Sequence, residues 1–336
     1  MILMKFKTAF LYSGPHPVHK EWAELINADF VSNQVKGTSL NVWIIGRFVK
    51  SFSVQKTIPK NIDLLLCESG SEIIAGALWK KKNPSKKLAL IVDDPKLFLL
   101  KKMNPITRSI YLWALKYFDL LIPTTDLMME AIPQEFRSKA KMAPMYADVE
   151  FFSQKQTDLN KKNLVFVGLV GEEKGVDKII ECFKIVQKDF PKSKLIIVGN
   201  GPKRKLYESM KIKNIEFAGY QDHQKIREIF LNSNIYINLA RIEPAGIAII
   251  EAMCAGLVPI VTENVGFKEI IRKVSPELVV DSSENAAKQI NRLWNDNVLL
   301  NNLSKKSVIE AKKITQDKSF NGFLNAINWL MQNENK

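Results

Sequence analysis

The stretch "RIEPAGIAIIEAMCAGLVPIV", residues 241–261, is mostly apolar but contains two glutamates, Glu243 and Glu251, eight residues apart. Burying a lone carboxylate costs free energy, and proteins do so only where partners are in place. The two glutamates therefore indicate either buried structural partners or a polar ligand that reaches them.

The residues around the glutamates predict a strand followed by a helix. "NIYINLA" (234–240) is a short apolar run typical of a buried strand. Pro244 suits the first position of a helix and Gly256 suits its end, so we expect a helix from Pro244 to about Ala255. The first turn of such a helix presents free N–H groups and the positive end of the helix dipole, which together form an anion site. The residues of that turn are Ala245, Gly246 and Ile247.

Glu251 would then lie about two turns into this helix, roughly 10–12 Å along the axis from Glu243 at about 1.5 Å per residue. Because helical side chains lean toward the N-terminus, its carboxylate would point back toward the opening at which Glu243 lies. Two acceptors on either side of an anion site suit a ligand that has hydroxyl groups on both sides of a phosphate. A nucleotide sugar is such a ligand.

The C-terminal half of the chain alternates short apolar runs, glycines and amphipathic helical patterns. This alternation predicts a parallel sheet with helices on both faces, in which ligands bind beyond the carboxyl ends of the strands. The expected strands are residues 163–168, 194–199, 214–219, 234–240, 257–262 and 277–280.

The N-terminal half has a similar but less regular pattern. Its expected strands are residues 8–14, 41–46, 62–70, 87–94 and 118–124. The pattern favours an α/β chain of two Rossmann-like domains that face a cleft. The expected parts are a domain over 1–152, a polar linker over 153–162, a second domain over 163–318 and a terminal helix over 319–336.

Length and composition agree with two domains. The chain has 336 residues, of which 46% are hydrophobic, and about 150 residues a domain is usual. Three isolated cysteines without a CxxC pair predict buried thiols in a reducing compartment, and three histidines make a histidine-rich metal site improbable. The start "MKFKTAFLYSG" is interpreted as a first buried strand and not as a signal peptide, and we expect no transmembrane helix.

The net charge of +14 is unevenly distributed. Residues 80–116 contain ten basic residues against Asp93 and Asp94, a balance of 10 − 2 = +8. This stretch is either a solvated lysine-rich face or a contact for an anionic surface, such as a membrane leaflet, a lipid phosphate or nucleic acid. In the case of a membrane, the apolar run 97–100 beside Asp93 is expected to contribute apolar side chains to the same surface. The apolar spacing around Tyr111, Trp113 and Tyr117 is more typical of a packed helix than of a base-stacking surface, so nucleic acid is not the expected partner.

Residues 163–275 resemble the retaining glycosyltransferases of family 4, which have the GT-B fold. The resemblance rests on three segments: "EPAGIAIIE", which matches the family's E-x7-E motif, "VGLVGEEKGVDKIIECF" and "LIIVGNGP". It implies two Rossmann-like domains and a C-terminal helix, residues 319–336, that crosses back to the first domain.

The resemblance also implies roles for single residues. Glu251 would hold the ribose hydroxyls, Glu243 the donor sugar hydroxyls, and Lys174 would neutralise the diphosphate. The remaining matches are glycine turns and the residues beside them: Gly14 over the phosphates, Gly199 after the second strand, Gly219 and Tyr220 at the base, and Gly266 with Glu269 beside the donor sugar.

The chain departs from the family at two places. Where the family usually has Gly-Arg, it has Gly168–Leu169, and Arg241 is the candidate to replace the missing arginine. Where the family commonly has a histidine in the N-terminal domain, the matching position is Asp93 or Asp94. His16 and His19, in the first loop, are the alternatives. Glu243, Lys174 and Asp93 are thus the expected catalytic residues.

The expected activity is transfer of a sugar, with retention, from a nucleotide-diphosphate sugar to a hydroxyl acceptor. The acceptor is expected to be lipid-linked or membrane-associated, which would place the protein in the cytoplasm and on the cytoplasmic face of a membrane. Two alternatives stay open: the same chemistry on a soluble acceptor, and a basic α/β protein that is non-catalytic or binds nucleic acid. No metal or other cofactor is expected. These residues do not distinguish a GDP-sugar donor from a UDP-sugar donor.

Overall fold

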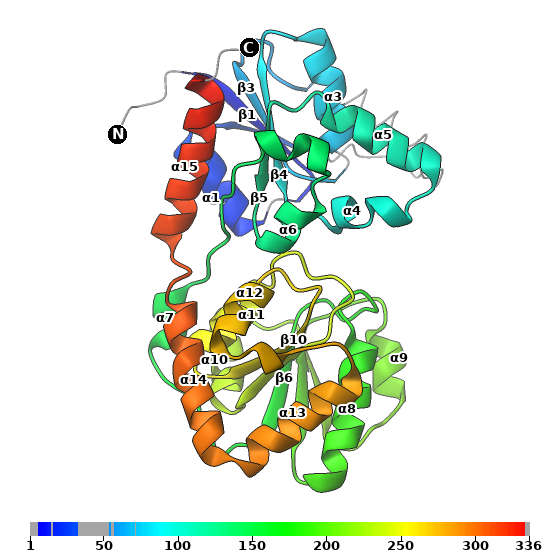
Figure 1. Ribbon diagram of the computed structural model, residues 1–336, viewed down its shortest axis with the longest axis vertical. Coiled ribbons are helices and arrows are strands. Elements are labelled where there is room, and N and C mark those ends of the chain that lie inside the picture. The colour runs from blue at the N-terminus through cyan, green and yellow to red at the C-terminus, as the bar shows by residue number, and fades with distance from the viewer. Residues whose placement is uncertain (1–5, 15, 33–53, 55–56, 71, 333–336) are drawn as a thin grey trace. The chain divides into compact units, whose positions relative to one another are not determined.

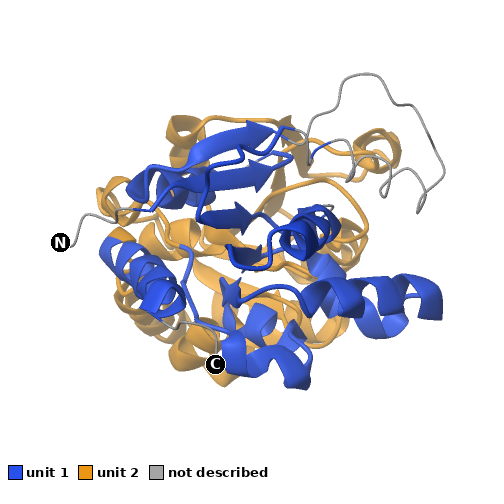
Figure 2. Cartoon of the chain, turned by 90° about the horizontal axis from the view of Figure 1, so that it is seen from above, with its two compact units in different colours: residues 1–145, 317–336 blue, residues 146–316 orange. Residues whose placement is uncertain are grey.

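The computed structural model describes residues 6–14, 16–32, 54, 57–70 and 72–332. The chain forms two compact units (Figure 2). The first contains residues 1–145 and 317–336, and the second contains residues 146–316. The strand expected over 41–46 lies outside the described residues.

The described part of the first unit contains a five-stranded parallel sheet with the order β2-β1-β3-β4-β5 (Figure 1). Four of its strands confirm sequence predictions, whereas β2 was not predicted. The central strands β3 and β4 are apolar on both faces, as strands covered by helices on both sides are. The strands are β1 (Thr8–Tyr12), β2 (Asp29–Ser32), β3 (Leu64–Cys67), β4 (Lys87–Val92) and β5 (Leu120–Pro123).

Helices of this unit cover the sheet, and α3 packs against α5. Their apolar faces join the strands in one core, which includes Trp79, Tyr111 and Phe118. The helices are α1 (Pro17–Leu25), α3 (Glu72–Lys82), α4 (Pro95–Phe98), α5 (Pro105–Leu115) and α6 (Asp126–Ala131), with short 3-10 turns at Leu100–Lys102 and Gln134–Lys139.

The C-terminal helix α15 (Gln316–Gln332) is part of the first unit, apart from its first residue. The buried Trp22 of α1 stacks on Phe323, with ring centroids 5.1 Å apart, and its indole N–H donates to Ser319 Oγ at 3.0 Å. Lys141 lies 4.6 Å from the ring centroid of Trp329. These contacts confirm the expected return of the chain to the first unit.

The second unit contains a six-stranded parallel sheet with the order β11-β10-β9-β6-β7-β8. All six strands predicted in this half are present. They are β6 (Asn163–Val167), β7 (Lys194–Val198), β8 (Ile215–Gly219), β9 (Ile235–Asn238), β10 (Val258–Thr262) and β11 (Val279–Val280).

Helices lie on both sides of this sheet (Figure 1), where α8 packs against α13 and α11 against α14. In α8 the residues Ile179, Ile180, Phe183 and Val186 are buried, which is the helical spacing that the sequence predicted. The helices are α7 (Val149–Ser153), α8 (Val176–Asp189), α9 (Arg204–Ser209), α10 (His223–Leu231), α11 (Ile247–Cys254), α12 (Lys268–Val274), α13 (Ser283–Asn295) and α14 (Asn297–Ala311), with a 3-10 turn at Pro276–Leu278.

The segment expected to be a linker, 153–162, is part of the second unit. The backbone N–H of Thr157 donates to the carbonyl of Ala255 at 2.8 Å, and the amide of Asn234 donates to the carbonyl of Leu159 at 2.9 Å. These bonds fasten the segment to the unit's core, and the unit begins earlier, at Tyr146. The polar composition of this segment predicted a free linker, because a local sequence pattern does not show contacts with residues that are distant in the sequence.

Candidate functional site

Glu243 and Lys174 meet at the carboxyl end of the second unit's sheet. The carboxylate of Glu243 lies 2.9 Å from the ammonium group of Lys174, and the two side chains are 16% and 19% exposed. Glu243 follows β9, and its backbone pairs with a neighbouring loop: its N–H donates to the carbonyl of Asn264, and its own carbonyl accepts from Gly266. Two residues named from the resemblance are therefore brought together, with Gly266 beside them.

The segment that holds Lys174 is fixed by close backbone contact with the strand end before Glu243. The N–H of Arg241 donates to the carbonyl of Glu173 at 2.9 Å. Gly175 has φ +65°, and a Cβ there would lie 1.9 Å from the carbonyl oxygen of Leu239. A side chain at position 175 would displace the segment, so this glycine positions Lys174 against Glu243.

The helix that follows Glu243 begins later than predicted. Helix α11 starts at Ile247, and Gly246 precedes it with φ +84°. Pro244 is thus not its first residue, because the backbone of Glu243 is held in pairing with residues 264–266 and the chain turns into the helix only at Gly246. The end of the helix at Cys254, followed by Gly256, agrees with the prediction.

Glu251 lies inside α11 and is almost fully buried. Burial raises the pKa of its carboxyl to about 7, and the negative charge of Asp148 adds to the increase. The buried Tyr236, whose hydroxyl donates to the carbonyl of Val167 at 3.0 Å, has its pKa raised by burial and by the charges of both Glu243 and Glu251. Both glutamates are therefore close enough to Tyr236 for their charges to raise the pKa of its hydroxyl.

Arg241 is already engaged within the unit. Its guanidinium donates to both carboxylate oxygens of Asp177, at 2.8 and 2.6 Å, and to the carbonyl of Glu172 at 2.6 Å. The hydrogen bonds from Arg241 hold the pKa of Asp177 below its usual range. A phosphate contact by Arg241 would have to compete with Asp177, so its replacement role stays a prediction.

Gly199 and Gly219 also lie together, at the carboxyl ends of β7 and β8. The N–H of Gly199 donates to the carbonyl of Gly219 at 2.7 Å. Gly199 has φ +123°, and a Cβ there would lie 2.0 Å from the carbonyl oxygen of Gly168. Tyr220 follows this turn and is exposed, as a residue that contacts a ligand base would be.

The first unit has a second polar cluster at the carboxyl ends of its own strands. His19 Nδ1 lies 3.0 Å from Glu68 Oε1 and 3.5 Å from Asp93 Oδ2. Ser69 donates to the other oxygen of Asp93, and the N–H of His16 donates to Glu68 at 3.2 Å. The structure thus brings together Asp93 and His19, which sequence reasoning treated as alternatives.

Glu68 and Ser69 were missed by sequence reasoning. They directly follow β3 in "CESG", and a polar pair after a buried strand was the signal that could have indicated them. Asp94, the other strand-end acid, accepts from the backbone N–H of Lys96 and pairs with its ammonium group at 2.6 Å, so it caps helix α4. At Gly14 an added Cβ would meet no atom within 4 Å, which leaves space at the end of β1.

The electrostatics of this cluster depend on burial. Burial raises the pKa of Asp93, against the opposing effects of His19 and Ser69, and the charges of Glu68 and Asp94 raise it further. Burial and the neighbouring His19 lower the pKa of His16 to about 4, so His16 is neutral at pH 7.

Among the described residues, His19, Glu68 and Asp93 are the group close enough to be considered for a metal ion. However, His19 Nδ1 already makes a hydrogen bond of ordinary length to Glu68, and its buried Nε2 has no partner among the described residues. A metal-bound histidine normally has a partner at its other ring nitrogen. The arrangement therefore fits a hydrogen-bonded triad better than a metal centre.

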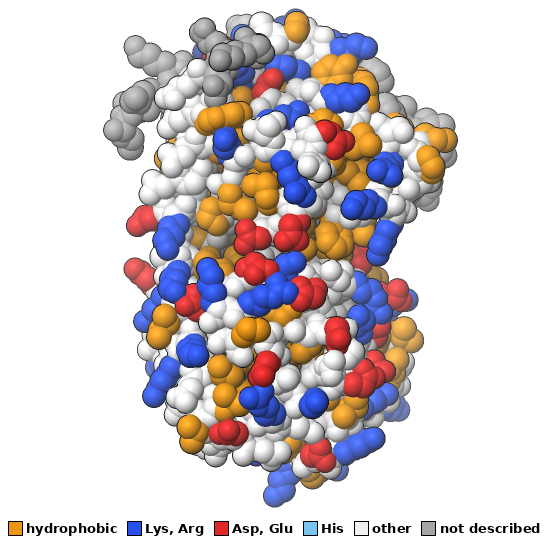
Figure 3. Space-filling view, in the orientation of Figure 1, with side chains coloured by type: hydrophobic (Ala, Val, Ile, Leu, Met, Phe, Trp, Pro, Cys, Tyr) orange, Lys and Arg blue, Asp and Glu red, His pale blue; other side chains and the backbone are white. Residues whose placement is uncertain are grey.

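The basic stretch 80–116 separates into buried and exposed residues. Lys80 is buried and pairs with Asp119 at 2.8 Å, and Lys86 pairs with Asp63 at 3.3 Å. The exposed basic residues are Lys81, Lys82, Lys101, Lys102, Arg108 and Lys116. On the face seen in Figure 3, basic side chains lie dispersed among apolar and uncharged ones.

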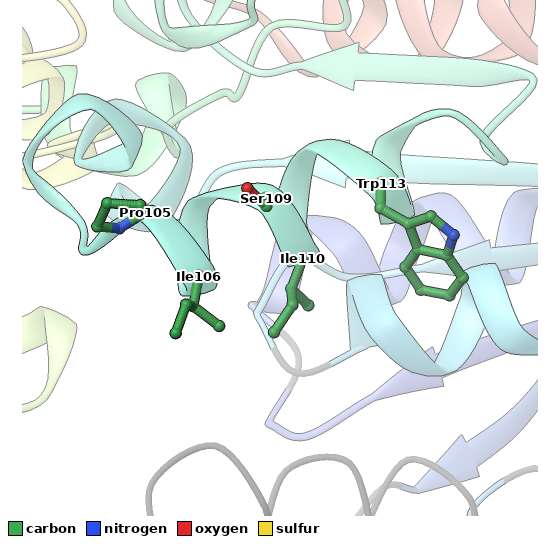
Figure 4. Close-up of a pocket in the computed structure, with 5 residues that line it drawn as sticks. All are labelled: Pro105, Ile106, Ser109, Ile110 and Trp113. Atoms are coloured by element: carbon green, nitrogen blue, oxygen red, sulfur yellow. The ribbon is translucent and has the colours of Figure 1, made fainter.

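The apolar part of this surface is also not the predicted one. Leu97 and Leu100 belong to the core. Helix α5 instead presents Ile106, which is 70% exposed, with Ile110 and Trp113 along the same side (Figure 4). These residues line an open pocket of about 530 Å³. Within the described residues, no helix combines the length and apolarity needed to cross a bilayer.

The chain is similar in sequence to known glycosyltransferases. Residues 148–313 match the family model described as Glycosyl transferases group 1. The chain is 24% identical over 158 residues to alpha-monoglucosyldiacylglycerol synthase of Acholeplasma laidlawii, covering 46% of this chain and 40% of that protein. It is 27% identical over 143 residues to a phosphatidylinositol N-acetylglucosaminyltransferase protein of Arabidopsis thaliana, covering 40% and 32%.

The fold matches solved structures over most of the chain. The structure of HepE from Anabaena in complex with UDP-glucose aligns with a TM-score of 0.75 at 14% identity, covering 96% of this chain and all of that one. Neighbours of this kind confirm the predicted GT-B fold. The chain spans 40%, 56% and 32% of the length of the first curated relatives that it matches.

Proposed function

We propose, from the chain's place in the superfamily of GT-B glycosyltransferases, that it moves a sugar with retention from a nucleotide-diphosphate sugar to a hydroxyl acceptor. The observation that carries this proposal is the ion pair of Glu243 and Lys174 at 2.9 Å, with Glu251 buried in the next helix. Lys174 offers a positive charge to a phosphate group, and the two glutamates offer carboxylates to the hydroxyl groups of a ligand.

On the donor side, Lys174 and the N-terminus of α11 would stabilise the negative charge that grows on the departing diphosphate. Glu243 would accept hydrogen bonds from the donor sugar, and Glu251 from the ribose. Gly219 and Tyr220 would contact the base, and Gly14 would leave room for the phosphates. Arg241 would bind the diphosphate only if it first broke its hydrogen bonds to Asp177.

We infer a front-face reaction, because none of the described side chains is an evident nucleophile. The bond between the anomeric carbon and the phosphate oxygen breaks, the bond from the acceptor oxygen to that carbon forms, and the acceptor proton leaves on the phosphate. Asp93 would face the acceptor side of this reaction. No metal or cofactor takes part in this scheme.

The proposed acceptor is lipid-linked, held at an anionic membrane surface from the cytoplasmic side. Two relatives have lipids in their names, and α5 combines the exposed Ile106 and the half-buried Trp113 with nearby Lys101 and Lys102. Each lysine near an anionic leaflet is worth about 1 kcal/mol within a Debye length. A soluble acceptor is the second candidate, favoured by a relative named 2-deoxystreptamine N-acetyl-D-glucosaminyltransferase.

A donor screen tests the proposed activity. The full chain is incubated with UDP- and GDP-sugars, and release of nucleotide diphosphate is measured without added acceptor. We expect slow hydrolysis of one donor, with retained configuration of the released sugar at early times. Absence of hydrolysis and of nucleotide binding across the panel would contradict the proposal.

Vesicle binding tests the acceptor class. We expect binding to vesicles that contain acidic phospholipid, weakening as salt rises, and little binding to neutral vesicles. Lys101→Glu with Lys102→Glu should reduce it, as should Ile106→Ser. The control is Lys305→Glu with Lys306→Glu, an exposed pair in the second unit. Equal binding to both kinds of vesicle, or none to either, would favour the soluble acceptor.

A further inference from the structure

The polar cluster of the first unit comes from three neighbouring strands. In the sheet order, β1, β3 and β4 are adjacent. His19 lies on the helix after β1, Glu68 directly follows β3, and Asp93 directly follows β4. In open α/β sheets this edge is where ligands bind, so the cluster occupies a functional position in its unit.

The three side chains differ in how far they reach solvent. The side chain of His19 is 0% exposed, that of Glu68 is 10% exposed and that of Asp93 is 22% exposed. His19 is therefore the innermost member, and Asp93 is the member that a substrate can touch. His19 also packs its ring beside Trp22, at 5.3 Å between centroids, which fixes its orientation.

Asp93 is held from two directions. Ser69 donates to Oδ1, while the hydroxyl oxygen of Ser69 accepts from the N–H groups of Asp93 and Asp94, at 3.2 and 2.9 Å. On the other side, Oδ2 faces His19 Nδ1, which also bonds Glu68. Such a chain of contacts fixes both the place and the direction of a carboxylate.

We propose that His19 and Glu68 are positioning residues for Asp93: Glu68 holds His19 in place, and His19 keeps the carboxylate of Asp93 ionised and directed outward to accept a hydrogen bond from the acceptor hydroxyl. This inference rests on the proposed function. Asp93 orients the hydroxyl, and the proton still leaves on the departing phosphate, so no further reactant is needed.

The charges around Asp93 make this role necessary. Glu68 and Asp94 lie near it and disfavour its ionised form, as burial does, whereas His19 favours it. Further out, His16 lies beside His19, and Glu72 and Lys96 lie around Gly70. Without His19, carboxylates would predominate around Asp93, and Asp93 would take up a proton at a higher pH.

The test compares two amides at position 19. His19→Asn places its amide nitrogen near the position of Nδ1, so it keeps a donor to Glu68 and Asp93. His19→Gln places the amide nearer Nε2 and removes that donor. Donor hydrolysis, in which water takes the acceptor's place, is measured from pH 5 to 9 for both, with Lys20→Gln as the control on the exposed side of the same helix.

We expect His19→Gln to move the acid limb of the rate profile upward by roughly one pH unit, since a nearby opposite charge or donor lowers a carboxylate pKa by about 1–3 units. At pH values below that limb, the rate of donor hydrolysis by His19→Gln should be about tenfold lower than that of wild type. At high pH the rate should largely return to the wild-type value. His19→Asn should lie between His19→Gln and wild type, and Glu68→Gln should lose rate without the upward shift.

Calorimetry with the free nucleotide diphosphate separates this inference from the proposed function. If wild type binds and hydrolyses the donor, but His19→Gln shows an unshifted profile, the positioning role is wrong. The same conclusion follows if one metal ion per chain copurifies and is lost in Asp93→Asn. If wild type neither binds nor hydrolyses any donor, the proposed function fails first.

Discussion

The two units place opposite chemistry at the same edge of the same kind of sheet. In the second unit, Lys174 and Glu243 form a partly exposed ion pair at 2.9 Å. In the first unit, Glu68 and Asp93 surround a single buried histidine. On the proposed function, one edge accepts phosphate and the other holds a carboxylate toward a hydroxyl. Two similar folds thus differ in chemistry through the residues that follow their strands.

Lys174 should have the largest effect of the residues at the edge of the second unit's sheet. We expect Lys174→Ala to lower the rate of donor hydrolysis at least a hundredfold, because the charge that stabilises the departing diphosphate is removed. The control is Lys203→Ala, a half-exposed lysine that pairs with Glu172 at 2.9 Å. Equal rates for the two variants would remove Lys174 from the donor site.

Glu251 should make nucleotide binding depend on pH. Its pKa is raised to about 7, so its carboxylate is ionised above pH 7 and increasingly protonated below. If ribose hydroxyls donate to the ionised form, affinity for the nucleotide diphosphate should be constant above about pH 7.5. It should fall up to tenfold per pH unit as pH drops below 7.

Glu251→Gln supplies the control for this pH dependence. The variant should bind more weakly at pH 8 and show a flat profile from pH 5.5 to 8, measured by calorimetry. A wild-type affinity that does not change over this range, or a variant that binds as tightly as wild type, would rule out the ribose role.

Arg241 should give the smallest loss. Its guanidinium is bound by Asp177, so Arg241→Ala is expected to weaken nucleotide-diphosphate binding by about 1 kcal/mol or less, against about 1.5–3 kcal/mol for a charge-assisted bond lost at Lys174. Calorimetry on both variants measures the difference. A loss at Arg241 as large as that at Lys174 would mean that Arg241 leaves Asp177 for the phosphate.

The sequence indicated the second unit better than the first, for physical reasons. The alternation of strands and helices and the spacing of Glu243 and Glu251 are local, and both are present in the structure. The late start of α11 at Ile247 depends on pairing between Glu243 and residues 264–266, which no local pattern contains.

The cluster of the first unit could not be assembled from sequence, because its contacts are distant. His19 and Glu68 are 49 residues apart, and only the order of the strands brings them together. The burial of Leu97 and Leu100 likewise depends on packing against the first unit's core, so the run 97–100 suggested an exposed apolar surface that the structure places on α5 instead.

On the proposed function, the Lys174–Glu243 pair is a donor site that opens when phosphate replaces the carboxylate. Calorimetry of the full chain with UDP and GDP, on wild type, Lys174→Ala and Glu243→Gln, measures this exchange. We predict that one nucleotide binds, that Lys174→Ala weakens it at least tenfold, and that Glu243→Gln binds as tightly as wild type or more tightly, because Lys174 is no longer neutralised. No binding of either nucleotide, or a Glu243→Gln loss equal to that of Lys174→Ala, would mean that phosphate does not replace Glu243 at Lys174.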